Sequence, residues 1–254
     1  MLLQLEDISY FYGKQAALSH INLTIKQGMN LLLGPNGAGK STLFALLTLL
    51  QNPHSGSMVF DGEPLDKNHR NLLREFGVVF QLSSLDLDLT VEQNLMYYGH
   101  LHGLNQKQVT QRAQPLLDAF ALADFLNRTV RSLNIGHRRR LEIVRALIHH
   151  PKLLLLDEPS SSLDIPAREA LNHCLRNWIR QHQLSVLWST HLIEDIESSD
   201  HIILLHKGRC FAQGSAQELC ITLRCDNVSA VFRKMVSGAE TQVNIGLGES
   251  KMPS

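Results

Sequence analysis

The amino-acid sequence predicts an α/β fold with a mainly parallel sheet, and three features carry that prediction. Short apolar segments alternate with stretches of helical periodicity, which is the pattern of parallel strands joined by helices. Four consecutive leucines at 153–156 suit a strand buried on both faces. A glycine-rich turn at 34–39 separates one apolar segment from the helix that follows it. Hydrophobic residues make up 44% of the chain, which is enough for a core and excludes a disordered protein.

The first part of the chain is expected to form strands and one helix. The helix covers residues 40–51 and ends before Asn52-Pro53, because proline cannot continue a helix. The expected strands are 2–8, 21–26, 30–33, 57–60 and 76–81.

The character of the sequence changes between about residues 85 and 150, where clear strands are absent. Helical periodicity there predicts a helical subdomain inserted into the α/β core, with helices near 91–102, 107–119 and 136–150. Beyond it, a long helix is expected with Pro166 in its first turn. The expected elements are strands at 153–157, 185–190, 201–206 and 209–213 and this helix at 166–182. The polar, glycine-containing stretch 237–254 is expected to be a flexible tail.

The charge balance limits the classes of partner. Lysine plus arginine total 24 and aspartate plus glutamate total 24, so the net charge is zero and gives no overall attraction to nucleic acid or anionic lipid. No apolar run approaches the ~20 residues that span a bilayer, and the N-terminus lacks the basic start of a signal peptide. The four scattered cysteines favour reduced thiols. We therefore expect a cytoplasmic protein with no membrane span of its own.

Residues 34–41 form the pattern G-x-x-x-x-G-K-S between a predicted strand and a predicted helix. Glycines let the backbone curl so that its N–H groups point at phosphate oxygens, and the helix start adds positive potential. Lys40 can reach the β- and γ-phosphates, and the Ser41 hydroxyl can ligate Mg²⁺. The alternative is a plain glycine-rich turn. The expected nucleotide-binding residues are Gly34, Pro35, Asn36, Gly37, Ala38, Gly39, Lys40, Ser41 and Thr42.

The predicted strand 153–157 delivers two acids, Asp157 and Glu158, at its carboxyl end, where open α/β sheets bind ligands. Neighbouring residues on a strand point to opposite sides, so the two acids should have different roles. Asp157 is expected to hold Mg²⁺ and Glu158 to polarise an attacking water. The alternative is a strand that ends in solvated acids.

In motif order and spacing, residues 2–222 resemble the ATP-binding subunit of an ABC transporter, in the branch of drug and sodium exporters. The resemblance implies a P-loop NTPase core with a mainly parallel sheet, an N-terminal antiparallel β subdomain and an inserted helical subdomain, all within residues 1–236. It also implies ATP and Mg²⁺ as cofactors, and a membrane permease and a second ATP-binding subunit as partners.

The resemblance assigns roles to four further residues. Tyr12 matches an aromatic that stacks on adenine, although core packing is the alternative. Gln81 matches the glutamine loop, which reaches toward Mg²⁺ and water. Asp164 ends the segment that resembles the D-loop at the dimer interface. His191 matches the switch histidine at the γ-phosphate, whereas a lone histidine after a strand would be structural.

The family's signature, commonly Leu-Ser-Gly-Gly-Gln, is altered to Leu-Asn-Ile-Gly-His at 133–137. In one interpretation, Asn134 and Gly136 keep the phosphate contacts, because an asparagine amide can still donate and also caps helices. In the other, Ile135 weakens the site, because a β-branched residue resists positive φ and adds bulk. The arginines 138–140 form either a solvated helix face or a positive field near phosphate.

The expected function is an ATPase that powers a membrane permease, by resemblance an exporter, with the surface near Gln81–Tyr98 facing the permease. The alternatives are a regulatory subunit with little turnover and a soluble ABC ATPase without a permease. The absence of an N-K-x-D motif argues against a GTPase.

Overall fold

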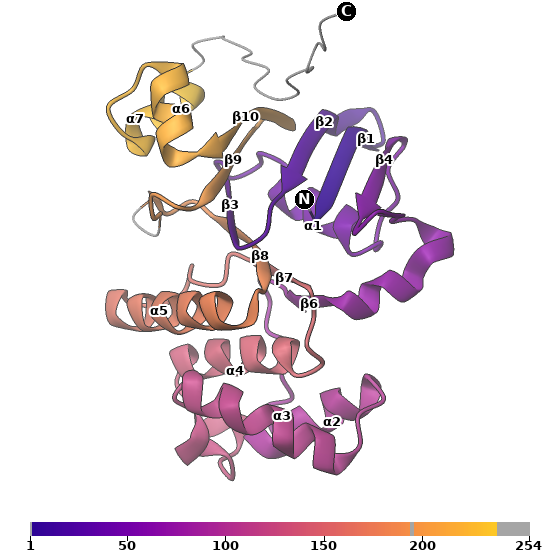
Figure 1. Ribbon diagram of the computed structural model, residues 1–254, viewed down its shortest axis with the longest axis vertical. Helices are drawn as coiled ribbons and strands as arrows, with labels where there is room; N and C mark the ends of the chain where they lie inside the picture. Colours follow the sequence, from indigo (N-terminus) through magenta and orange to yellow (C-terminus); the bar gives the residue numbers. More distant parts are fainter. Residues whose placement is uncertain (1, 194–195, 238–254) are drawn as a thin grey trace, which may run out of the picture.

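The computed structural model describes residues 2–193 and 196–237 (Figure 1). The predicted tail after residue 237 lies outside the described residues. The strands form two sheets. The N-terminal sheet is antiparallel, in the order β2-β1-β4-β5. Its strands are β1 (Leu3–Tyr12), β2 (Gln15–Ile25), β4 (Ser55–Phe60) and β5 (Glu63–Pro64).

The second sheet has the order β10-β9-β3-β8-β7-β6 and is parallel except for the β9–β10 hairpin. Because β3 and β7 both border β8, their carboxyl ends lie at the same edge of the sheet. Its strands are β3 (Met29–Leu33), β6 (Phe76–Val79), β7 (Leu153–Asp157), β8 (Ser185–Thr190), β9 (His201–His206) and β10 (Arg209–Ser215). The predicted α/β class with a mainly parallel sheet is confirmed.

The leucines of β7 show why this strand is apolar throughout. Leu153 and Leu155 pack into a core shared with α1 (Lys40–Leu47) and the antiparallel sheet. Leu154 and Leu156 pack into a second core with α5 (Ile165–His182) and the helical region. Since side chains alternate across a strand, burial on both faces requires an uninterrupted apolar run.

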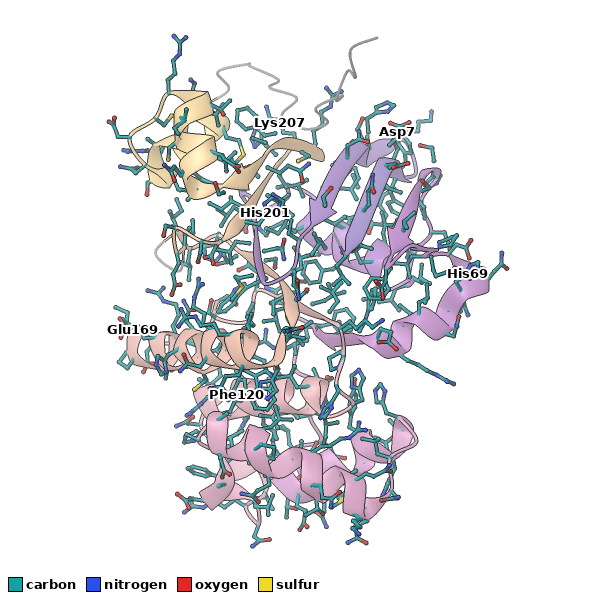
Figure 2. The ribbon with its side chains drawn as sticks, in the orientation of Figure 1. Asp7, His69, Phe120, Glu169, His201 and Lys207 are labelled. Carbon is teal, nitrogen blue, oxygen red and sulfur yellow. The ribbon has the colours of Figure 1, made fainter. Side chains whose placement is uncertain are left out.

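The helical region lies below the sheets in Figure 1 and contains α2 (Val91–Leu101), α3 (Gln106–Ala119) and α4 (Ile135–Leu147). Its first two helices begin with capping boxes, in which Thr90 pairs with Gln93 and Asn105 with Gln108. Phe120 is fully buried and joins this region to α5 through Trp178 (Figure 2). All three helices lie where the periodicity predicts them.

Several element ends differ from the predicted ones. The helix expected over 40–51 ends at Leu47, because the Thr48 hydroxyl donates to the Phe44 carbonyl and Leu49 turns to φ +53°. The strand expected over 76–81 ends at Val79. Five helices of the described residues were not predicted, because short segments give few periodic positions. They are the 3₁₀ helices Lys67–Glu75, Ala123–Phe125 and Val130–Ser132, and the α-helices α6 (Ala216–Leu223) and α7 (Val228–Val236).

None of the helices among residues 2–193 and 196–237 is long and apolar enough to cross a membrane. All four cysteines are free thiols, as expected.

A half-buried histidine pair lies between α2 and β6. The rings of His102 and His149 stack with centroids 3.9 Å apart, and His149 Nε2 lies 3.0 Å from the Phe76 carbonyl oxygen. Burial, together with the His102 charge, lowers the pKa of His149 to about 4. Protonation of His149 is therefore disfavoured in the folded state.

We expect this pair to make the fold sensitive to acid. Below a pH of about 6.5, His149 becomes protonated in the unfolded chain but stays neutral in the folded chain until the pH nears 4. The free energy of unfolding therefore falls as the pH decreases from 6.5 to about 4. The substitution His149→Gln should reduce that loss by about 1–3 kcal/mol, since one pKa unit is worth about 1.4 kcal/mol. Urea unfolding across this pH range measures it. His100→Gln, at an exposed position of α2, is the control, and equal acid sensitivity in all three proteins would contradict the assignment.

Candidate functional site

The glycine-rich loop between β3 and α1 is shaped by close packing. A Cβ atom at Gly34 would lie 2.4 Å from the Leu205 carbonyl oxygen. Gly39 has φ +108°, and a Cβ atom there would lie 2.7 Å from Leu18 Cδ2. Both positions therefore require glycine. Gly39 is the N-cap of α1 and provides no side-chain cap, so the first amides of the helix are left for another acceptor.

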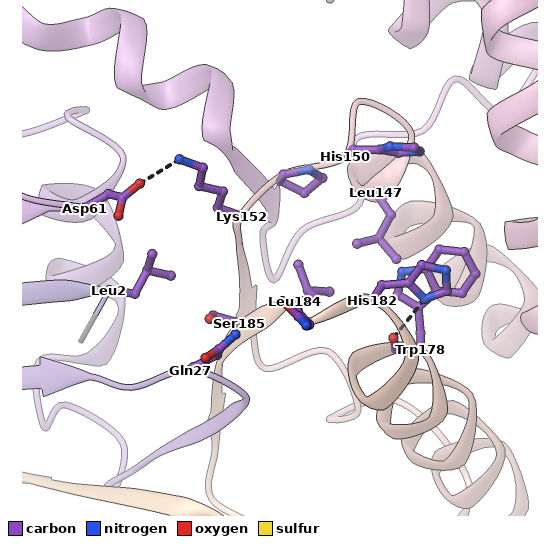
Figure 3. A pocket seen from close by; sticks show the side chains of 12 residues that line it. Leu2, Gln27, Asp61, Leu147, His150, Lys152, Trp178, His182, Leu184 and Ser185 are labelled. Atoms are coloured by element: carbon purple, nitrogen blue, oxygen red, sulfur yellow. Dashed lines mark hydrogen bonds and ion pairs between the residues drawn. The ribbon is translucent and has the colours of Figure 1, made fainter.

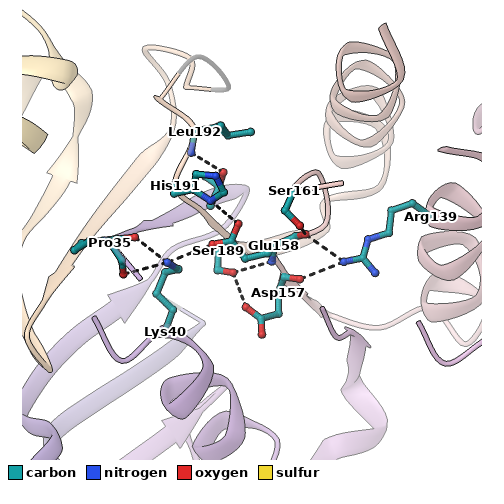
Figure 4. A network of polar contacts seen from close by, with 11 residues as sticks. Pro35, Lys40, Arg139, Asp157, Glu158, Ser161, Ser189, His191 and Leu192 are labelled. Carbon is teal, nitrogen blue, oxygen red and sulfur yellow. Dashed lines mark hydrogen bonds and ion pairs between the residues drawn. The ribbon is translucent and has the colours of Figure 1, made fainter. Parts of the chain in front are cut away.

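Lys40 is buried, with 7% of its surface exposed. Its Nζ donates to the Gly34 carbonyl at 2.7 Å and the Pro35 carbonyl at 3.4 Å, and lies 3.3 Å from Glu158 Oε1 (Figure 4). A buried ammonium needs such partners, because desolvation of an unpaired charge is costly. Each of these oxygens occupies a donor direction that an incoming phosphate oxygen could take.

The sequence predicted that Asp157 and Glu158 alternate along one strand, but they do not. β7 ends at Asp157, and Glu158 has the left-handed φ of +48°. This turn brings Glu158 back toward the phosphate loop. Its Oε2 lies 2.9 Å from His191 Nδ1, while its Oε1 faces Lys40. The expectation of opposite-facing strand residues was therefore wrong for Glu158, although the two acids do have different contacts.

Asp157 is held by a hydroxyl that the sequence analysis did not single out. Ser189 Oγ, at the carboxyl end of β8, donates to Asp157 Oδ1 at 2.7 Å and accepts from the Glu158 amide at 2.9 Å. Burial raises the pKa of the Asp157 carboxyl, and the Ser189 hydrogen bond partly offsets the effect. The Glu158 charge raises this pKa further, while the Lys40 charge and the Ser41 hydroxyl lower it. A buried carboxylate whose charge is not fully balanced is well suited to coordinate a cation.

The loop, Glu158 and His191 surround one cavity of about 620 Å³. Tyr12 lies at its rim, 54% exposed, with its ring edge-on to Tyr10 at 5.0 Å, so it is not a core residue. Of the predicted site residues, those that line the cavity are Tyr12, Pro35, Asn36, Gly37, Ala38, Gly39, Lys40, Ser41, Thr42, Gln81, Glu158 and His191. Ser161, Lys207 and Gly208 also line it and were not among the predicted residues.

Five predicted residues do not line the cavity. Gly34 and Asp157 directly precede lining residues in the sequence, whereas Asn134, Gly136 and Asp164 belong to other segments. Asn134 caps α4 by accepting from the His137 amide at 2.8 Å, and Asp164 caps α5 by accepting from the Ala167 amide at 2.9 Å. A Cβ atom at Gly136 would lie 3.2 Å from Ala167 Cβ, so the two helix starts are neighbours. In a single chain, these residues form a second location, separate from the phosphate loop.

Ile135 does not need the positive φ that was expected for it. It is the first residue of the right-handed helix α4, and its side chain is 56% exposed. A β-branched residue is acceptable at that position. The loop therefore begins its helix normally despite the altered sequence.

The three arginines after this loop are neither a solvated face nor a free positive field. Arg138 donates to the Val130 and Arg131 carbonyls, and Arg140 donates to the Phe120 carbonyl. Arg139 is buried and donates to the carbonyls of the Asp157–Pro159 turn. Three adjacent arginines look alike in the sequence, so the burial of Arg139 was not predicted. The one signal for it is the spacing of Arg139 and Glu142, which lie one helical turn apart and can form an ion pair.

A second cavity, of about 590 Å³, lies at the amino ends of β3, β7 and β8, at the opposite edge of the sheet (Figure 3). Three of its polar side chains have partners, since Lys152 pairs with Asp61 at 2.6 Å and His182 Nδ1 lies 3.1 Å from the Trp178 carbonyl oxygen. No predicted site residue lines it.

Comparisons with known proteins identify the family. A family model described as ABC transporter matches residues 18–161. The chain is 35% identical over 230 residues to the Nod factor export ATP-binding protein I of Cupriavidus metallidurans, covering 89% of this chain and 76% of that protein. It is 31% identical over 226 residues to the ABC transporter ATP-binding protein NatA of Bacillus subtilis, covering 87% and 92%.

A solved structure also matches. It is a dimeric ATP-binding cassette in a post-hydrolysis state, bound to ADP and Pi, with a TM-score of 0.73 and 27% identity over 84% of this chain and 98% of that one.

We expect Lys40→Ala to lower the affinity for a nucleoside triphosphate by at least about tenfold, because a charge-assisted contact to phosphate is lost. Isothermal calorimetry measures it. Lys107→Ala, at an exposed position of α3, should bind normally. Unaltered binding by the Lys40 variant would contradict the role of the loop.

Proposed function

The chain belongs to the ABC transporter family and is an ATPase of that family, and we propose that it hydrolyses ATP to power a membrane permease, with residues 1–236 as its ATP-binding domain. The observation that carries the proposal is the buried pair of Lys40 and Glu158 at the phosphate loop, whose Nζ and Oε1 atoms are 3.3 Å apart, with His191 in contact with Glu158 at the surface.

The residues around the cavity fit ATP with Mg²⁺. The amides of the loop and of the first turn of α1, with Lys40, suit the phosphates, and Tyr12 suits the adenine ring. The donor set for Mg²⁺ would be Ser41, Gln81 and Asp157, which supply only oxygen atoms. Mg²⁺ bound there would neutralise charge on the phosphate oxygens.

The chain's own residues then divide the work of hydrolysis. When a phosphate oxygen replaces Glu158 as the acceptor of Lys40, the Glu158 carboxylate loses this cationic partner and can accept a proton from water. Water attacks the γ-phosphorus, the bond to the β-phosphate oxygen breaks, and ADP and inorganic phosphate leave. His191 keeps the Glu158 carboxylate oriented through the contact at 2.9 Å and places a ring next to the γ-phosphate.

We propose that a second ATP-binding subunit, identical or related, completes the site. Asn134, Gly136 and Asp164 lie at the starts of α4 and α5, away from the cavity of their own chain. The dimeric state of the matching cassette supports their action across an interface. The normal start of α4 at Ile135 argues against a regulatory subunit with a disabled signature loop.

We propose that the permease docks near Gln81. Apolar side chains are exposed on the residues that flank Gln81, Phe80 at 39% and Leu82 at 83%. Tyr97 at 63% and Leu101 at 66% are exposed on α2, which follows this segment in the chain. Such docking would hold the protein at the inner face of the cell membrane, without a span of its own. The relative named for Nod factor export supports export as the direction.

The substitution Glu158→Gln tests hydrolysis. It removes the proton acceptor, so kcat should fall by at least about a hundredfold while ATP still binds. Phosphate release and calorimetry measure the two. Glu169→Gln, on the exposed face of α5 (Figure 2), is the control. Full ATPase activity in the Glu158 variant would contradict its assignment as the base.

The substitution Leu82→Glu tests docking, because a charge is disfavoured in an apolar interface. The variant should lose co-purification with a membrane protein from detergent-solubilised membranes. The ATPase activity of the purified chain should stay within about twofold, since the residue lies outside the cavity. Ile221→Glu, equally exposed on α6, should behave as the unmodified protein. Normal co-purification of the Leu82 variant would argue for another docking surface.

A further inference from the structure

We infer that Arg139 is a positioning residue for ATP hydrolysis, whose buried guanidinium holds the backbone turn that directs Glu158 at the phosphate loop. The inference rests on the proposed function and adds to it a residue that belongs to neither the phosphate loop nor the acid pair. Figure 4 shows the Arg139 side chain extended from α4 toward Asp157 and Glu158.

The contacts of Arg139 are concentrated on one turn. Its Nε donates to the Pro159 carbonyl at 2.9 Å, and its Nη2 donates to the carbonyls of Asp157 at 3.2 Å and Glu158 at 3.3 Å. The residue is 7% exposed. Three consecutive carbonyls thus accept from one planar, rigid group, which fixes their relative orientation.

That turn would not hold itself in this conformation. Glu158 has φ +48°, which is uncommon for a residue other than glycine. It also precedes Pro159, and a residue before proline is biased toward extended backbone. Two local preferences therefore oppose the conformation that brings the Glu158 carboxylate to Lys40. Hydrogen bonds must hold it. Ser161 donates to the Glu158 carbonyl and Ser189 accepts from the Glu158 amide, and Arg139 supplies three further bonds that span the whole turn.

Arg139 also joins this turn to the segment that contains Gln81. Its Nη1 donates to the Phe80 carbonyl at 2.9 Å, directly before Gln81, and to the Glu142 carboxylate one helical turn along α4. The Glu142 charge balances the guanidinium and sets its orientation. One side chain on the helix after the signature loop thereby links the glutamine segment to the catalytic turn.

The neighbouring arginines provide a matched comparison. Arg138 and Arg140 belong to the same run but donate only to carbonyls of the helical region, at Val130, Arg131 and Phe120. A general role in holding α4 would be shared by all three, whereas a role in directing Glu158 belongs to Arg139 alone.

The test compares Arg139→Gln and Arg139→Lys with Arg138→Gln and Arg140→Gln. We measure phosphate release against the concentration of Mg-ATP, with thermal unfolding of each protein. For Arg139→Gln, kcat should fall by at least about tenfold while KM for ATP stays within about threefold, because the phosphate loop is untouched. Arg139→Lys should recover part of kcat. The two control variants should keep kcat within about twofold.

Chemical rescue separates positioning from general stability. In Arg139→Ala, millimolar guanidinium should restore part of kcat by refilling the space, and should leave Arg138→Ala unaffected. If Arg139→Ala does not fold, the double variant Arg139→Met/Glu142→Leu replaces the pair without leaving a buried charge, and the same loss of kcat is expected.

Normal kcat in the folded Arg139 variants would overturn the inference. So would an equal loss in the Arg138 and Arg140 variants, or a loss confined to KM. Absence of ATPase activity in the unmodified protein would instead contradict the proposed function, so the two failures are distinguishable.

Discussion

The ion pair between Lys40 and Glu158 is the contact on which the arrangement of the site depends. It joins the loop after β3 to the turn after β7, two strands that are not neighbours in the sheet. β8 lies between them and supplies Ser189 and His191 from its carboxyl end. The strand order thus decides which side chains can meet, and an ammonium and a carboxylate buried together tolerate desolvation that neither would tolerate alone.

The same pair explains how the chain can hold a charged site before phosphate binds. The Lys40 ammonium has two carbonyls and one carboxylate as acceptors, and each is an oxygen atom. Phosphate offers the same kind of atom with more negative charge, so exchange needs no new pocket and little rearrangement of the lysine. In the proposed mechanism, binding of phosphate thereby releases Glu158 from Lys40 and leaves it in contact with His191.

The sequence predicted the parts of this site whose chemistry lies in a local pattern. The phosphate loop and the acid pair were recognised because glycine spacing and an apolar strand depend on near neighbours in the chain. The left-handed turn at Glu158 was missed, because the apolar run before it indicated a continuing strand and the force that bends it comes from Arg139, nineteen residues away. A positive φ was expected at Ile135, whereas the residue begins the right-handed helix α4. The sequence alone does not distinguish a helix start from a loop at this position. Likewise, three adjacent arginines cannot be ranked by burial until the helix that carries them is placed on the sheet.

The positions of the remaining predicted residues bear on how the protein assembles. Asn134 and Asp164 mark the starts of two helices that pack closely, with Gly136 against Ala167. The guanidinium of Arg139 ties α4 to the turn after β7, so the helix starts cannot move onto their own phosphate loop without breaking the contacts that direct Glu158. The residues that we propose to contact phosphate therefore occupy two places that one chain cannot bring together while it keeps the turn at Glu158 in position. A second subunit facing the first resolves the conflict, because it can present its own helix starts to the cavity while every contact within each chain is kept.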